Sequence, residues 1–428
     1  MNFLKGRQGA GAGSMYVAGA FGISGLLTYV FHGLVGRYLG QVGYGDFGVL
    51  WTQVFLVAQV LWIGVSQTLG RYIAEREARG EDAAPVVSAV RRLTLVMVAA
   101  FVVVTLPLSP LLAGTVFGGS YLLALAFVAA VVLYAPEYFR RGTFGGQRQF
   151  ARLGALHVVE SSSRMLVGAG LLFVGAGVVG AAAAVVLAPL LAVLVVRPPS
   201  PTPEDRPVET QVVEPFSAVR AFRFAGPVVA CVALAQALMN GGPLLVRLLG
   251  GTSAEVGLFV AALILARTPQ YVLSPVISSL LPHASRTLTT DGITGFDRFI
   301  LRSVVAVGAM GVLMVAGTWL LGEWALGLVY GPEFDAGTGI LTLLAALAAF
   351  YLLTETLSQA LFALGRARLA SLGWLLGLPV AAVVMLLSSA GTLERVSFSL
   401  ALGAAAAALG QAAFYLLARR GLSGRDTG

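Results

Sequence analysis

The sequence is poor in charge, in cysteine and in histidine. Only 11% of its 428 residues are Asp, Glu, Lys or Arg, whereas about a quarter of an ordinary soluble domain is charged. The single cysteine, Cys231, excludes a disulfide framework and a cysteine zinc site within one chain. The sequence contains no recognisable nucleophile–base pair, metal-ligand cluster or phosphate-binding loop. It therefore predicts a protein that is not an enzyme and that carries no metal and no cofactor.

Hydrophobic residues make up 57% of the sequence, and 53 residues are glycine. This composition is typical of a polytopic membrane protein, in which small residues let helices approach each other closely. The fold class is therefore expected to be all-α integral membrane. Lys and Arg (28) outnumber Asp and Glu (20), but the placement of the basic residues in loops accounts for this excess, so no nucleic-acid partner is expected.

Apolar runs of about 20 residues, the length that crosses a hydrocarbon core, occur twelve times. They run roughly over residues 14–36, 47–69, 93–112, 121–135, 153–173, 178–196, 218–240, 256–281, 299–321, 339–361, 369–387 and 397–417. Lys5 and Arg7 precede the first run, which does not end in a small-residue cleavage signal. We therefore expect an uncleaved first span and about twelve transmembrane helices.

Basic residues are distributed unequally between the two sides that these spans define. Twenty-three lie on the side of the N-terminus, three lie on the other side (Arg37, Arg247 and Arg395), and Arg164 and Arg267 lie inside spans. Short cytoplasmic loops hold the excess of Lys and Arg in membrane proteins. The sequence thus predicts a multi-pass protein of the cell inner (plasma) membrane with both termini in the cytoplasm.

A proline-rich stretch separates the sixth and seventh spans. It begins RPPSPTPEDRP at residue 197, and such a composition favours an extended linker. The expected organisation is an N-terminal six-helix lobe over 1–197, a cytoplasmic linker over 198–215, and a C-terminal six-helix lobe over 216–428.

Three short motifs recur in the same order in the two halves. RYLG (37–40) matches RLLG (247–250), VFG (116–118) matches VYG (329–331), and the basic turn 144–148 matches 362–366. Because six spans precede the linker and six follow it, both halves enter the membrane with the same orientation. The sequence predicts two lobes related by a parallel repeat around a central cavity, as in a rocking transporter.

Four segments combine glycine, aromatic and basic residues: RYLGQVGYGDFG (37–48), GVSQTLGRYIAE (64–75), RGTFGGQRQF (141–150) and VYGPEF (329–334). Through these segments, the chain resembles the oligosaccharide flippases of the multidrug, oligosaccharidyl-lipid and polysaccharide exporter (MOP) superfamily over nearly its whole length. The resemblance implies the twelve-span polysaccharide branch. The sequence departs from many relatives at NGGP (240–243), where those relatives have an acidic residue after the Asn.

Ionisable residues inside spans are candidates for function, because a charge at the bilayer centre is costly. Arg267 lies about eleven residues into the eighth span, with Gln270 three positions on and Thr268 and Pro269 between them. This pattern predicts a locally broken polar helix that binds substrate. Pairing of Arg267 with Glu355 is the alternative interpretation.

Two acidic residues are candidates for binding a coupling proton or Na⁺. Glu160 lies four residues before Arg164 in the fifth span, so the two share a helix face. They form either a structural ion pair or part of the cavity. In the cavity, Arg164 would contact substrate. Glu355 lies in the polar stretch TETLSQ of the tenth span. It either binds the coupling ion or bonds neighbouring helices.

Further polar residues complete the predicted substrate site. Arg37 and Arg247 lie at matching repeat positions at the outer ends of the first and seventh spans; they either extend to the interface or contact substrate. Gln53, Gln236 and Asn240 offer hydrogen bonds that suit a sugar, although most such groups bond between helices.

Three functions are consistent with the sequence. The first is a flippase that moves a polyprenyl-(pyro)phosphate-linked oligosaccharide from the cytoplasmic to the outer leaflet by alternating access, for cell-surface polysaccharide assembly. The guanidinium groups of arginine match the phosphate oxygens of such a substrate. The partners of this flippase would be that lipid-linked oligosaccharide, membrane lipids, a coupling proton or Na⁺, and polysaccharide assembly proteins. The second is a cation-coupled multidrug exporter of the same fold, and the third is a membrane glycan polymerase or glycosyltransferase.

Overall fold

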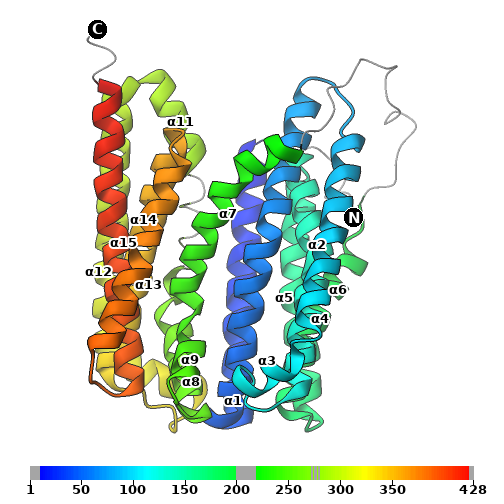
Figure 1. Ribbon diagram of the computed structural model, residues 1–428, viewed down its shortest axis with the longest axis vertical. Helices are drawn as coiled ribbons and strands as arrows, with labels where there is room; N and C mark the ends of the chain where they lie inside the picture. The colour runs from blue at the N-terminus through cyan, green and yellow to red at the C-terminus, as the bar shows by residue number, and fades with distance from the viewer. Residues whose placement is uncertain (1–9, 199–217, 271–272, 274–276, 278–279, 424–428) are drawn as a thin grey trace. The chain divides into compact units, whose positions relative to one another are not determined.

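The computed structural model describes residues 10–198, 218–270, 273, 277 and 280–423, and these residues contain helices and no strand (Figure 1). The predicted spans fall on helices in the described residues, except that the third (93–112) is interrupted by a turn at 106–108 and that part of the eighth lies outside the described residues. Eight of the described helices are long and apolar enough to cross a membrane, and α7 (Ala218–Asn240) and α8 (Gly242–Leu248) form a further, bent pair. The structure is that of an all-α multi-pass membrane protein.

The first two spans form one element, α1 (Ala10–Ala78), which is interrupted only at Gly40. Gly40 has φ 63° and ψ −177°, a conformation that glycine adopts without steric cost. The predicted loop after the first span is therefore reduced to a single-residue break, because helical hydrogen bonding continues on both sides of it.

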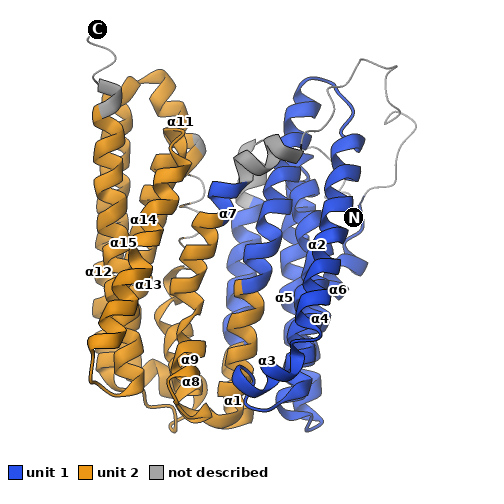
Figure 2. Ribbon diagram, in the orientation of Figure 1, with its two compact units in different colours: residues 1–31, 57–229 blue, residues 32–56, 230–428 orange. Residues whose placement is uncertain are grey.

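One compact unit contains residues 1–31 and 57–229 (Figure 2, blue). Besides the two ends of α1 and the start of α7, it contains α2 (Ala84–Thr105), α3 (Ser109–Thr115), α4 (Tyr121–Gly146), α5 (Phe150–Phe173) and α6 (Gly177–Val195). Within it, a Cβ on Gly142 of α4 would lie 2.5 Å from the backbone oxygen of Ser66. Glycine here allows α4 and the second arm of α1 to touch through their backbones.

The other compact unit contains residues 32–56 and 230–428 (Figure 2, orange). It is built from the middle of α1, the end of α7, α8, α9 (Ser253–Ala266), α11 (Leu280–Thr290), α12 (Gly292–Tyr330), α13 (Gly337–Ala363), α14 (Ala367–Leu387) and α15 (Thr392–Ser423). Helices α12 to α15 run side by side in this unit (Figure 1). The hairpin 32–56 thus packs with the second half of the chain, although the sequence predicted a lobe over 1–197. The linker over 198–215 lies almost entirely outside the described residues, and the lobe boundary there stays a prediction.

Two of the three repeated motifs share a glycine with positive φ at the aligned position. Gly40 and Gly250 both have positive φ, and so do Gly118 and Gly331. In the basic turns, the amide of Gln149 donates to the carbonyl of Phe144, and the amide of Arg366 donates to the carbonyl of Leu361, each at 2.8 Å. Such a bond closes a helix end around one residue with positive φ, which is Arg148 (54°) in one turn and Gly365 (68°) in the other. The two turns are thus of the same kind, although they are shifted by one residue from the alignment of the motifs in the sequence. These shared turns support the parallel duplication.

Candidate functional site

A buried cluster of charges lies between α4 and α5 in the first unit. Glu160 accepts a hydrogen bond from the Tyr134 hydroxyl at 2.8 Å and pairs with Arg164 one helical turn later on α5. Arg141 of α4 lies 2.5 Å from Glu137 and 3.7 Å from Glu160. Two guanidinium groups therefore balance two carboxylates, which is the condition under which buried charge is tolerated.

Three charged members of this cluster are withdrawn from the surface, whereas Arg141 is half-buried. The exposed fractions are 0% for Glu137, 4% for Glu160 and 3% for Arg164. His157, one turn before Glu160, joins the two carboxylates, and the potential ligand atoms of the three side chains lie within 4.8 Å of one another. Among the described residues, the Oε2 atom of Glu137 has no hydrogen-bond partner. The arrangement is thus able to accept a proton or a small cation at Glu137.

The sequence predicted the Glu160–Arg164 pair from its spacing, and the structure contains that pair. Glu137 was missed, because the fourth span was expected to end at Ala135 whereas α4 continues to Gly146. The spacing of Glu137 and Arg141, four residues apart, is the signal that would have found it.

Arg267 lies where α9 ends in the second unit. It is the C-terminal cap of α9, it is 8% exposed, and its Nη1 donates to Asn240 Oδ1 at 2.9 Å. Asn240 in turn donates to Gln236 at 2.5 Å on α7. The break predicted near Arg267 is therefore present, and three predicted site residues form one hydrogen-bonded chain. The amide of Asn240, which accepts from this guanidinium, is neutral.

The remaining polar candidates of the second unit are Gln270, Gln53 and Glu355. Gln270 follows Arg267 closely, and its buried Oε1 has no hydrogen-bond partner among the described residues. Gln53 is 7% exposed, and its Nε2 is likewise unbonded within the described part of the chain. Glu355 accepts a hydrogen bond from Gln359 at 2.9 Å along α13. Orphaned buried amides of this kind are sites where a bound molecule or water gains hydrogen bonds.

The two arginines at matching repeat positions have protein partners within the second unit. Arg37 donates to the backbone oxygens of Val329, at 2.9 Å, and of Leu328, at the C-terminal end of α12. A cation is stabilised there by the helix dipole and by carbonyls that lack helical partners. Arg247 pairs with Asp46 at 2.5 Å, and both contact the Ser253 hydroxyl at 3.0 Å.

These contacts join the hairpin 32–56 to α8, α9 and α12. Close backbone approach accompanies them: a Cβ on Gly45 would lie 1.8 Å from the Ser253 oxygen, and one on Gly257 would lie 2.1 Å from the Gln41 oxygen. Arg37 and Arg247 therefore hold helix ends together in this state. Asp46 was not a sequence candidate, because its partner lies 201 residues away in the chain.

Comparison with known proteins identifies the family. The family described as "Polysaccharide biosynthesis protein" matches residues 10–288. Uncharacterized proteins of Mycobacterium bovis and Mycobacterium tuberculosis are 25% identical to this chain over 369 residues, covering 84% of this chain and 81% of theirs.

Solved transporters share the fold. An inward-facing multidrug resistance MATE family transporter of the MOP superfamily has a TM-score of 0.69 at 16% identity, with 96% of each chain covered. A MOP superfamily transporter from Pyrococcus furiosus has a TM-score of 0.70 at 14% identity, with 99% of this chain and 97% of that chain covered. The chain therefore belongs to the polysaccharide biosynthesis protein family and has the fold of the MOP superfamily transporters.

Proposed function

We propose that this protein is a flippase that moves a polyprenyl-(pyro)phosphate-linked oligosaccharide from the cytoplasmic to the outer leaflet by alternating access, for cell-surface polysaccharide assembly. Arg267 carries the proposal. It is buried at the end of a broken helix and bonded to the amide of Asn240. A guanidinium fork matches phosphate oxygens, and amides such as Gln236 and Gln270 match sugar hydroxyls.

The sign of the charge favours an anionic cargo. A cavity that selects cationic drugs needs unpaired carboxylates, but Glu160 is paired with Arg164 and Glu137 with Arg141. Moving a pyrophosphate through lipid is costly because its charge must leave water. An arginine held at membrane depth lowers that cost for an anion and raises it for a cation.

Coupling of transport to a proton or Na⁺ is assigned to two acidic positions. In the first unit, Glu160 acts with Glu137 and His157, whose ligand atoms lie close together. In the second unit, Glu355 supplies the carboxylate. Proton or Na⁺ uptake at Glu137 would weaken its pairing with Arg141. Arg141 would then interact more strongly with Glu160, 3.7 Å away on α5, and this would link ion binding to the contact between α4 and α5.

Membrane orientation follows from the basic residues, with both termini in the cytoplasm. Single cysteines placed at Arg366 and at Arg395, after replacement of Cys231 by Ala, test this. A membrane-impermeant maleimide added to intact cells should label the cysteine at 395 and spare the one at 366. The opposite labelling would reverse the topology and the proposed direction of transport.

The test of the site is genetic complementation of glycan export. Arg267→Ala, expressed at the wild-type level, should reduce surface glycan at least about tenfold, because one charged hydrogen bond contributes about 1.5–3 kcal/mol. Arg267→Lys keeps the charge without the fork and should retain part of the export. Arg302→Ala, an exposed arginine on α12, is the matched control. Unchanged export by Arg267→Ala would overturn the assignment of Arg267.

A cation-coupled multidrug exporter is the second candidate. The observation that favours it is the Glu137–His157–Glu160 cluster together with the fold shared with a multidrug resistance transporter. Deletion of the protein would then sensitise cells to cationic drugs and leave surface glycan intact. A flippase gives the converse result.

A further inference from the structure

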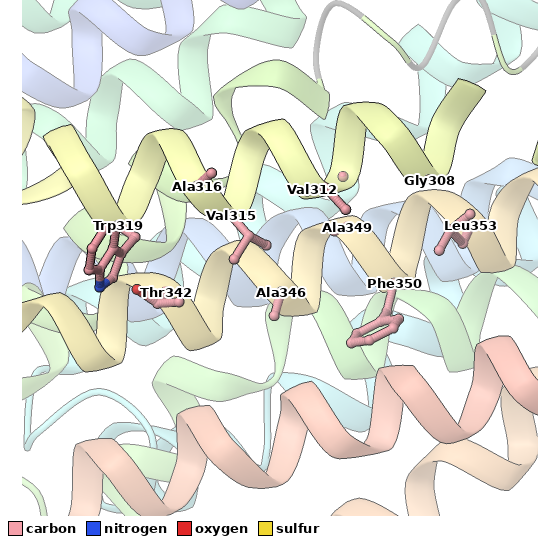
Figure 3. Close-up of a pocket in the computed structure, with 11 residues that line it drawn as sticks. Gly308, Val312, Val315, Ala316, Trp319, Thr342, Ala346, Ala349, Phe350 and Leu353 are labelled. Carbon is pink, nitrogen blue, oxygen red and sulfur yellow. The ribbon is translucent and has the colours of Figure 1, made fainter. Parts of the chain in front are cut away.

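A narrow groove runs along the surface of α12 and α13 in the second unit (Figure 3). Its volume is about 520 Å³. Its floor is the crossing of the two helices, where Gly311 and Ala349 meet: a Cβ on Gly311 would lie 3.0 Å from that of Ala349. Its rim includes Val312 and Trp319, which are 69% and 61% exposed. Small residues thus hollow out the groove between larger ones.

The length of the groove matches one leaflet of a bilayer. Its lining on α12 runs from Gly308 to Trp319, and the eleven steps between these residues rise about 16 Å at 1.5 Å per residue. Half of a typical hydrocarbon core is about 15 Å. Trp319 marks one end, beside Thr342 (Figure 3), and tryptophan is enriched at the membrane–water interface. The groove therefore has the dimensions of a single lipid chain that extends inward from the interface.

A carboxylate lies one turn beyond the tryptophan end of the groove. Glu323 is exposed, it follows Trp319 by four residues on α12, and it accepts a hydrogen bond from the Thr338 hydroxyl at 2.5 Å. Thr338 precedes the groove residue Thr342 by one turn on α13, and the Thr342 hydroxyl donates to its carbonyl at 2.7 Å. Glu323 and Thr338 thus bridge the two helices at the mouth of the groove and place a negative charge there.

We propose that this groove binds a zwitterionic phospholipid. One acyl chain lies between α12 and α13, and the ammonium group of the headgroup lies against the Glu323 carboxylate and the Trp319 ring. Charge complementarity selects this occupant: a carboxylate attracts an ammonium group, an aromatic face adds cation–π attraction, and an anionic headgroup is repelled. The lipid belongs to the leaflet at the Tyr330 end of α12, which is the outer leaflet in the proposed topology. Glu323 would repel the anionic head of the proposed glycan cargo.

Photo-crosslinking of the full-length protein tests the proposal. The protein is reconstituted in nanodiscs that contain a trace of phosphatidylethanolamine or phosphatidylglycerol, each with the same diazirine in one acyl chain, and labelled peptides are mapped by mass spectrometry. Phosphatidylethanolamine should label α12 and α13 at the groove more than phosphatidylglycerol does, and excess unlabelled phosphatidylethanolamine should compete. Equal labelling by the two lipids, or labelling that does not saturate, would overturn the proposal.

Two kinds of variant separate the groove from the charge. Gly308→Leu fills the groove without a close clash, since the nearest atom to its Cβ is 3.9 Å away, and should lower labelling about two- to fivefold through lost van der Waals contacts. Gly317→Leu is the control: it lies on the opposite face of α12 with no atom within 4 Å, and labelling should equal that of the wild type. Equal labelling of the two leucine variants would exclude the groove.

Glu323→Gln removes the charge and keeps the hydrogen bond to Thr338. The preference for phosphatidylethanolamine over phosphatidylglycerol should fall about two- to fivefold, the range for one exposed charge interaction. Glu394→Gln, an exposed acid at the start of α15, should leave the preference unchanged. An unchanged preference in Glu323→Gln would refute the role of the carboxylate.

Discussion

Glu160→Ala removes a carboxylate that bonds Tyr134 and pairs with Arg164 inside the first unit. The side chains of Glu160 and Arg164 are only 6% and 4% exposed. Removing one partner of a buried ion pair costs about 3–5 kcal/mol, because the other charge loses its counterion without regaining water. We expect the free energy of unfolding to fall by about that amount.

Arg71 and Glu75 provide a matched control within the same chain. They also lie four residues apart on a helix, with N···O 2.7 Å, but their side chains are 43% and 39% exposed. Exposed pairs with this spacing contribute about 0.3–0.5 kcal/mol. Glu75→Ala should therefore lower the free energy of unfolding by less than about 1 kcal/mol, although the two pairs look alike in the sequence.

The assay is denaturant unfolding of the purified protein in lipid–detergent micelles, followed by tryptophan fluorescence. Replacing both charges, as in Glu160→Gln with Arg164→Met, should recover most of the loss, since a buried pair can often be replaced by neutral groups at little cost. Equal stability of Glu160→Ala and Glu75→Ala would refute the reasoning. So would a double variant less stable than Glu160→Ala.

Two further predictions concern the contacts of the hairpin 32–56 with the second unit. Gly257→Ala should lower the free energy of unfolding by at least about 1–3 kcal/mol, because its Cβ would lie 2.1 Å from the Gln41 oxygen. Gly327→Ala is the control: a Cβ there has nothing within 4 Å, so this variant should have the wild-type value in the same unfolding assay. Asp46→Arg should reduce transport, because it breaks the 2.5 Å pair with Arg247 at a cost of about 1.5–3 kcal/mol. The charge-swapped double variant, Asp46→Arg with Arg247→Asp, should recover the transport. A double variant that transports no better than Asp46→Arg would contradict the importance of the pair.

Much of the fold could be predicted from the sequence, because the bilayer imposes strict requirements. Apolar length determines where the chain crosses, and the predicted spans fall on helices in the described residues, apart from a turn at 106–108 within the third. Glycines at repeated positions mark the turns: Gly40 and Gly250 both have positive φ. What apolar length does not specify is which helices become neighbours. The hairpin 32–56 packs with residues 230–428 through contacts whose partners are more than 200 residues apart.

The candidate site was predictable to the extent that its contacts are local. The spacing of Glu160 and Arg164 was sufficient to expect their pairing, and the Thr268–Pro269 sequence was sufficient to expect a break near Arg267. The contacts of Asp46 with Arg247, and of Arg37 with the end of α12, depend on tertiary structure and left no signal in a single sequence.

The most direct test of the proposed function is translocation of a lipid-linked oligosaccharide in proteoliposomes that contain only this protein. The substrate is loaded on one leaflet, and an impermeant glycosidase added outside measures how much glycan reaches the other leaflet. The flippase account predicts time-dependent transfer above that of protein-free liposomes, with Arg267→Ala at least about tenfold slower and Arg302→Ala unchanged. Transfer no faster than in protein-free liposomes, with active uptake of a cationic dye by the same preparation, would contradict it.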